Sequence, residues 1–171
     1  MSVEFFVGGW LEKRLGLYAA SHMVILPLIA LVAMACDWAP VEAAPPATLG
    51  WFLGASYANG LVLEVGRKIR APADEEAGVA TYSKRWGRPR AVATWGGSIV
   101  GAAVLSIVAA SRVGAGGWAA VVLLLVGGGI GAMAVRFLRS PTPARADPIE
   151  LCSGLWLLAS FASMGGLPLL V

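Results

Sequence analysis

The sequence predicts an all-α membrane protein, a polytopic bundle of five transmembrane helices. Of its 171 residues, 58% are hydrophobic and only 13% are charged, whereas soluble domains are about half apolar and about a quarter charged. The apolar residues also gather in runs of roughly 20, the length at which a helix crosses about 30 Å of hydrocarbon. Unpaired backbone groups are costly there and no run alternates like a barrel strand, so each run should be helical. This composition argues against a soluble enzyme and against a disordered chain.

The expected spans, in chain order, are about residues 15–36, 48–65, 91–110, 118–135 and 151–171. Together they form a single membrane domain covering residues 1–171, with one long loop at 66–90. About 14 mixed residues precede the first run, which is too long for the apolar core of a typical signal peptide. We therefore expect this segment to stay in the protein.

The loops between these spans predict the orientation of the chain. Twelve of the 13 Lys and Arg residues fall on the same side as the N-terminus, and Arg112 alone falls on the other. Cytoplasmic loops carry an excess of Lys and Arg. The sequence therefore predicts a cytoplasmic N-terminus, a cytoplasmic loop at 66–90 and a C-terminus outside.

Within the predicted helices, few residues carry specific information. Gly97 and Gly101, like Gly127 and Gly131, have the G-x-x-x-G spacing, which allows helix backbones to approach closely. His22 in the first helix is interpreted either as a proton relay or substrate contact, or as a neutral imidazole bonded to a neighbouring helix. We favour the second interpretation. So few intramembrane polar groups also argue against a small transporter.

The long loop contains the only acidic cluster, Asp74, Glu75 and Glu76. Basic residues lie on both sides of it: Arg67, Lys68 and Arg70 before, and Lys84, Arg85, Arg88 and Arg90 after. Carboxylates bind Mg²⁺, which bridges to phosphate oxygens, and Arg and Lys bind the remaining phosphate charge. Two interpretations follow: a site for a lipid diphosphate, or a solvated loop attracted to anionic lipid.

The spacing within this loop matches a known pattern. Asp74, Gly78 and Thr81 form D-x-x-x-G-x-x-T, and Gly87 follows. This resembles the second aspartate-rich motif of the UbiA superfamily of intramembrane prenyltransferases, roughly D-x-x-x-D-x-x-x-G-x-x-T followed by a glycine. A bacterial UbiA-like branch is also similar to the stretches EVGRKIRAPADEEAGVATYSKRWG and EFFVGGWLEKR.

The resemblance also implies where the chain would lie within that family. UbiA-like enzymes have nine helices, an inside N-terminus and an outside C-terminus, and their second motif follows helix six. Five helices with the motif after the second correspond to family helices five to nine, which is the C-terminal half. The resemblance implies an integral protein of the bacterial cytoplasmic (inner) membrane.

This chain departs from the family pattern at two places. The earlier Asp of the second motif falls on Arg70, and the first motif, N-x-x-x-D-x-x-x-D, is absent: Asn59 is followed by Leu63 and Arg67. A diphosphate is ionised between two sets of metal-bound carboxylates. We therefore expect activity only with a partner chain that supplies the first motif, or after self-association.

The resemblance implies transfer of a prenyl group from a prenyl diphosphate to a lipophilic acceptor, with Mg²⁺ as the cofactor. The implied catalytic carboxylates are Asp74, Glu75 and Glu64; the implied metal ligands are Asp74, Glu75 and Glu76; and the implied diphosphate-binding residues are Arg67, Lys68, Arg70, Lys84, Asn59 and Tyr82. The alternative is a non-catalytic membrane subunit or scaffold derived from a UbiA-like protein, which Arg70 and the missing motif favour. The bilayer is the expected environment, and no nucleic-acid partner is expected.

Overall fold

The computed structural model describes residues 14–166, and the regular structure of this part is entirely helical. The elements are α2 (Leu15–His22), α3 (Ile25–Trp38), η1 (Ala39–Val41), α4 (Leu49–Gly66), η2 (Pro72–Asp74), α5 (Tyr82–Trp86), α6 (Arg88–Ser111), α7 (Gly116–Arg139), α8 (Pro143–Phe161) and the π-helical turn η3 (Ala162–Gly166). The predicted all-α class is confirmed.

Four helical segments within the described residues are long and apolar enough to cross a membrane. They are Leu15–Val41, Arg88–Ser111, Gly116–Arg139 and Pro143–Gly166. These segments indicate an integral membrane protein. They correspond to the first, third, fourth and fifth of the spans expected from the sequence.

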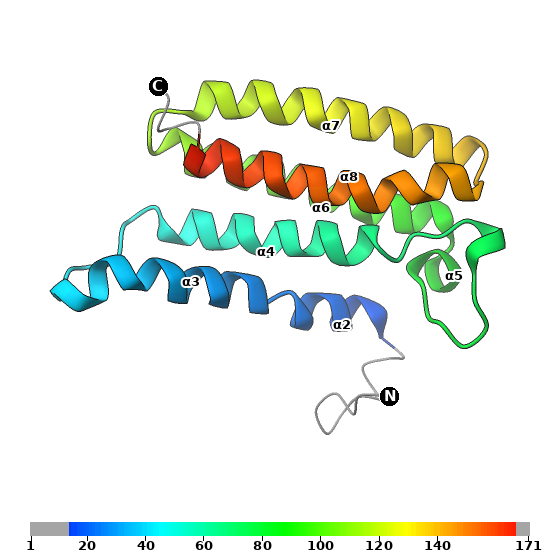
Figure 1. Cartoon of the computed structure of the whole chain (residues 1–171), viewed down its shortest axis with the longest axis horizontal. Coiled ribbons are helices and arrows are strands. Elements are labelled where there is room, and N and C mark those ends of the chain that lie inside the picture. The colour runs from blue at the N-terminus through cyan, green and yellow to red at the C-terminus, as the bar shows by residue number, and fades with distance from the viewer. Residues whose placement is uncertain (1–13, 167–171) are drawn as a thin grey trace.

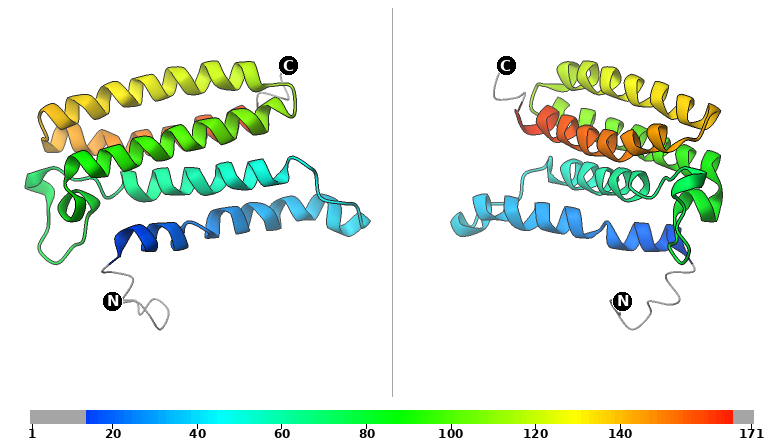
Figure 2. Two further views of the ribbon diagram at one scale, coloured as in Figure 1. Left: turned by 180° about the vertical axis from the view of Figure 1, so that it is seen from behind. Right: turned by 45° about the vertical axis from the view of Figure 1, so that its right-hand side comes forward.

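The remaining expected span, 48–65, forms α4, the central helix of the bundle. In Figure 1, α2 and α3 run end to end along one edge, α7 runs along the opposite edge, and α4 lies between them. Helix α4 contacts α3, α6 and α8, and the last two lie on opposite sides of the bundle (Figure 2). It is not among the four candidate spans, and it carries buried polar residues, including Ser56, Asn59 and Glu64.

Two helix boundaries differ from those expected. The first apolar run is interrupted at Met23 and Val24, where the helix breaks into α2 and α3. Pro27 explains the break, because proline has no N–H to donate one turn back. The last helix begins at Pro143 rather than near Leu151, with proline in its favoured first position. Its first two turns are charged, so hydropathy alone assigns them to a loop.

The charged residues gather at one end of the bundle. We call this the basic end: Arg14 with the start of α2, residues 64–90 from the end of α4 to the start of α6, and residues 136–150 around the turn from α7 to α8, all at the right in Figure 1. Eleven of the 12 Lys and Arg among residues 14–166 lie there, and Arg112 lies at the opposite end. The basic residues, which occur in alternate loops along the sequence, therefore lie together at one end of the folded chain.

Among the described glycines, Gly66 at the end of α4 leaves the least room for a side chain. A Cβ atom there would lie 2.0 Å from Ser153 Oγ and 2.9 Å from Trp95 Nε1. These two atoms are themselves hydrogen-bonded at 3.0 Å, with the indole N–H donating. Three helices therefore meet where only glycine fits.

The G-x-x-x-G pairs, in contrast, do not provide the close packing predicted for them. A Cβ atom on Gly97, Gly101 or Gly131 would meet no described atom within 4 Å. On Gly127 it would make only an ordinary contact, 3.4 Å from Trp156. Spacing identifies small residues, but it does not identify which helix face is packed.

Replacing Gly66 tests this packing. Gly66→Ala should destabilise the protein by roughly 1–3 kcal/mol, because the new methyl group displaces the Ser153 hydroxyl and the Trp95 indole. The measurement is thermal unfolding in detergent micelles, followed by tryptophan fluorescence. The matched control is Gly97→Ala in α6, which meets open space and should leave the Tm unchanged or raise it. Equal Tm values for the two variants would contradict the packing described here.

Candidate functional site

The motif residues build the charged loop. Gly78 and Gly87 have φ values of +82° and +80°, a region that side chains disfavour. Thr81 caps the start of α5: its Oγ1 accepts from the Lys84 backbone N–H at 3.2 Å and donates to Glu75 Oε2 at 2.6 Å. The two glycines and the threonine of the motif therefore each have a local structural role.

The loop is fastened to the ends of α4 and α6. The Arg70 backbone N–H donates to Ser83 Oγ at 2.6 Å, and the Tyr82 backbone N–H donates to the Lys68 carbonyl at 3.2 Å. From α6, Arg88 Nε donates to the Arg70 carbonyl at 3.2 Å. These bonds hold the acidic cluster close to the bundle.

Glu64 is the buried centre of a charged cluster at the end of α4. Its side chain is fully buried, and its Oε1 accepts from Lys68 Nζ at 2.7 Å and from the Tyr82 hydroxyl at 3.2 Å. Its Oε2 forms an ion pair with Arg67. Burial, followed by the neighbouring Glu64 charge, raises the pKa of Tyr82 above its usual range. The hydroxyl therefore remains a proton donor to Glu64.

Apart from Asn59, the predicted diphosphate ligands fall into two groups. Arg67 and Lys68 neutralise Glu64, and Tyr82 bonds to the same carboxylate. Arg70 and Lys84 lie beside the acidic loop instead: Arg70 forms an ion pair with Glu150 at 3.7 Å, and Lys84 Nζ donates to the Glu76 carbonyl at 3.1 Å.

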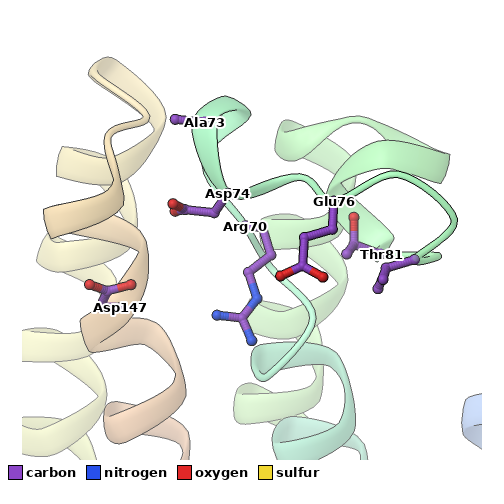
Figure 3. Close-up of a pocket in the computed structure, with 7 residues that line it drawn as sticks. Arg70, Ala73, Asp74, Glu76, Thr81 and Asp147 are labelled. Carbon is purple, nitrogen blue, oxygen red and sulfur yellow. The ribbon is translucent and has the colours of Figure 1, made fainter.

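A pocket of about 610 Å³ lies between the acidic loop and the start of α8. Its lining residues are Arg70, Ala73, Asp74, Glu76, Val79, Thr81 and Asp147. Figure 3 shows Asp74 pointing from the loop toward α8, which carries Asp147, with the Arg70 side chain near the pocket's centre. Asp74 Oδ2 is buried and accepts no hydrogen bond within the described structure.

The pocket thus brings together Asp74, Glu76 and Arg70 of the predicted site. Glu75 is held elsewhere: one carboxylate oxygen bonds to Thr81, and the other lies 3.8 Å from Arg88. Asp147 is a pocket residue that the sequence analysis missed. Thr142 and Pro143 carry the signal that could have found it, because a helix starting there places Asp147 at the basic end.

Asn59 lies in the core of the bundle rather than in the pocket. Its fully buried amide donates to Ser160 Oγ at 2.8 Å and accepts from Trp156 Nε1 at 3.0 Å. Ser160 also bonds to Ser106 at 2.7 Å, which links α4, α8 and α6. The amide is therefore satisfied by other helices.

The donor set at the pocket fits Mg²⁺ held jointly with phosphate. Mg²⁺ usually takes one or two carboxylates and completes its shell with waters and phosphate oxygens. Asp74 and Glu76 supply such carboxylates, and one Asp74 oxygen has no hydrogen-bond donor within the structure described. No group of three acidic, His or Cys side chains within residues 14–166 is placed to hold a metal by itself.

An apolar groove starts beside the Glu64 cluster. Its volume is about 530 Å³, and it is lined by Tyr18, His22, Met23, Ile25, Leu26, Leu63, Glu64, Arg67 and Glu150. A pocket of about 300 Å³ shares His22 and Ile25 with it and extends to Leu28 along α3. The imidazole of His22 stacks on Tyr18 with ring centroids 4.6 Å apart. The groove is charged at one end and apolar along α3.

Comparisons of this chain with protein-family models, with curated proteins and with solved structures find no match. The relation to the UbiA superfamily is therefore an interpretation of the sequence motif.

The role of Asn59 can be tested directly. Asn59→Ala should lower stability by about 1–3 kcal/mol, because it leaves the Trp156 N–H and the Ser160 hydroxyl without this partner. Thermal unfolding in micelles measures the effect. A variant with unchanged Tm but weakened diphosphate binding would contradict the structural role and favour the predicted ligand role.

The Glu64 cluster can be tested by a double-mutant cycle. Glu64→Gln should destabilise by about 2 kcal/mol, because it leaves the Lys68 and Arg67 charges at a partly buried site without a counter-charge. The double variant that adds Lys68→Gln should lose less unfolding free energy than the sum of the losses in the two single variants. The control is Glu42→Gln, exposed at the other end of the bundle. Additive costs would contradict the pairing of Glu64 with Lys68.

Proposed function

We propose that this chain is one half of a UbiA-like prenyltransferase of the bacterial inner membrane, which binds a magnesium–diphosphate headgroup at the pocket formed by Asp74, Glu76 and Arg70. The reaction would transfer a prenyl group from a prenyl diphosphate to a lipophilic acceptor. The motif D-x-x-x-G-x-x-T supports this assignment, and so does the pocket beneath it.

In this proposal the chain crosses the membrane five times, with α4 as the second crossing. Its 18 residues correspond to about 27 Å of helix, and it runs alongside α3, α6 and α8 (Figure 1). Protein packs around its polar side chains, so they do not face lipid. With the basic end in the cytoplasm, the N-terminus is inside and the C-terminus outside.

Asp74 carries the proposal. A buried carboxylate oxygen without a hydrogen-bond donor costs about 1–3 kcal/mol or more, and this one lies in a pocket with two further carboxylates, Glu76 and Asp147, and the guanidinium of Arg70. Such an excess of carboxylates suits a divalent cation. Mg²⁺ bound there would neutralise the charge that develops on a leaving diphosphate.

The remaining groups have roles that follow from their positions. Arg70 and Lys84 would hold diphosphate oxygens. The Arg70–Glu150 ion pair links the headgroup pocket to the apolar groove, because Arg70 lines the first and Glu150 the second. An amphipathic substrate with its head in the pocket would therefore have apolar space for its chain beyond this pair.

In this proposal a second carboxylate set comes from another chain. The first family motif is missing, and Arg70 replaces one Asp of the second. Another membrane chain that carries N-x-x-x-D-x-x-x-D, or a second copy of this one, would supply the opposing side of the diphosphate.

A non-catalytic membrane subunit is the second candidate function. Glu64 is neutralised by Arg67 and Lys68, and Asn59 is bonded in the core. Four of the residues implied by the family resemblance are therefore engaged in structural bonds. In this alternative the loop contributes to assembly with a larger complex.

The test is Mg²⁺-dependent binding of geranyl diphosphate to the purified full chain in micelles, measured by calorimetry. Asp74→Asn should weaken binding at least about tenfold, because it removes the charge of one ligand while keeping its shape. The control is Asp37→Asn, exposed at the opposite end, which should bind like the original protein.

Two results would count against the catalytic proposal. One is binding that does not depend on Mg²⁺, or that Asp74→Asn leaves unchanged. The other is a protein that binds no diphosphate even with its co-purifying membrane chain, while neutralising Arg70 and Lys84 alters that co-purification. The second result supports the subunit function instead.

A further inference from the structure

Three arginines gather on the turn between α7 and α8, away from the headgroup pocket. Arg136 and Arg139 lie in the last turn of α7, and Arg145 lies in the first turn of α8; all three are exposed. Arg145 Nη1 donates to the Arg136 carbonyl at 3.0 Å. This bond brings a third guanidinium to the end of α7.

The positive charge of these arginines has no carboxylate partner in the described part of the chain. The ion pairs there involve Glu64, Glu75 and Glu150, and none reaches this turn. The acidic residues of α8 lie toward the acidic loop instead. Glu150 pairs with Arg70, and Asp147 lines the pocket with Asp74 (Figure 3). Cations at a helix C-terminus are favoured by its dipole, but three neighbouring cations repel each other.

The arginines lie at the end of a helix whose apolar surface is largely exposed. Helix α7 forms one edge of the bundle in Figures 1 and 2. Its Leu124 and Leu125 are 72% and 74% exposed, and Val135 and Leu138 beside the arginines are exposed as well. The candidate span Gly116–Arg139 ends at these guanidinium groups. The end of a membrane span lies at the depth of the lipid headgroups.

We propose that Arg136, Arg139 and Arg145 bind the phosphate of an anionic phospholipid in the leaflet at the basic end. A guanidinium can hold two phosphate oxygens at once. The acyl chains would lie against Val135 and Leu138, so the headgroup and chains of one lipid match adjacent charged and apolar surfaces. This site is separate from the pocket and does not depend on prenyltransferase activity.

The experiment measures lipid retention by native mass spectrometry on the purified full chain in micelles. Phosphatidylglycerol is titrated, and phosphatidylcholine with the same chains is the neutral probe. Arg136→Gln and Arg139→Gln should each weaken phosphatidylglycerol binding about fivefold. Arg139→Lys should weaken this binding less, because lysine keeps the positive charge. Arg145→Gln is measured separately, because it also removes the bond to the Arg136 carbonyl.

Two exposed arginines provide matched controls. Arg85→Gln removes a charge at the same end of the bundle, and Arg112→Gln removes one at the opposite end. Neither should change the affinity by more than about twofold, and thermal unfolding should show that all variants fold.

Several outcomes would overturn the proposal. An equal loss in Arg85→Gln would indicate diffuse attraction to the basic end rather than a site. Equal retention of phosphatidylcholine would exclude recognition of charge. Displacement of the lipid by millimolar inorganic phosphate, with phosphate binding as tightly as the lipid, would identify a free anion as the ligand.

Discussion

The burial of Glu64 is the constraint on which the loop and the central helix both depend. A carboxylate out of water at the end of α4 requires counter-charges and hydrogen-bond donors. Lys68 and Arg67 supply the charges, and Tyr82 from α5 supplies a hydroxyl that stays protonated. This requirement draws the loop back onto the bundle. The pocket around Asp74 exists because the loop is held there.

The central position of α4 has a related physical cause. Membrane helices bury polar groups against each other, because lipid offers no hydrogen bonds. The Asn59 amide of α4 meets a hydroxyl and an indole N–H on α8, those of Ser160 and Trp156. Helices without such residues, above all α3, can occupy an edge, and none of the α3 residues is buried against the described chain.

Hydropathy predicted the all-α class and the approximate position of each long helix, because the cost of exposed backbone in lipid leaves few alternatives. It could not predict which groups pair. The loop carries seven basic residues, and nothing in their order shows that Arg67 and Lys68 turn toward Glu64 whereas Arg70 turns toward Glu150. Asp147 was missed because the charged first two turns of α8 resemble a loop. The glycine that packs tightly against Ser153 and Trp95 is Gly66, which belongs to no G-x-x-x-G pair.

The separation of charge between the two ends has an electrical consequence. Within residues 14–166, the basic end holds 11 cations and six carboxylates, and the other end holds one cation and two carboxylates. Moving one elementary charge across a membrane potential of about 100 mV costs roughly 2.3 kcal/mol. A membrane that is negative on the cytoplasmic side therefore favours the basic end inside. The energised membrane thus stabilises one orientation of the inserted chain over its inverse.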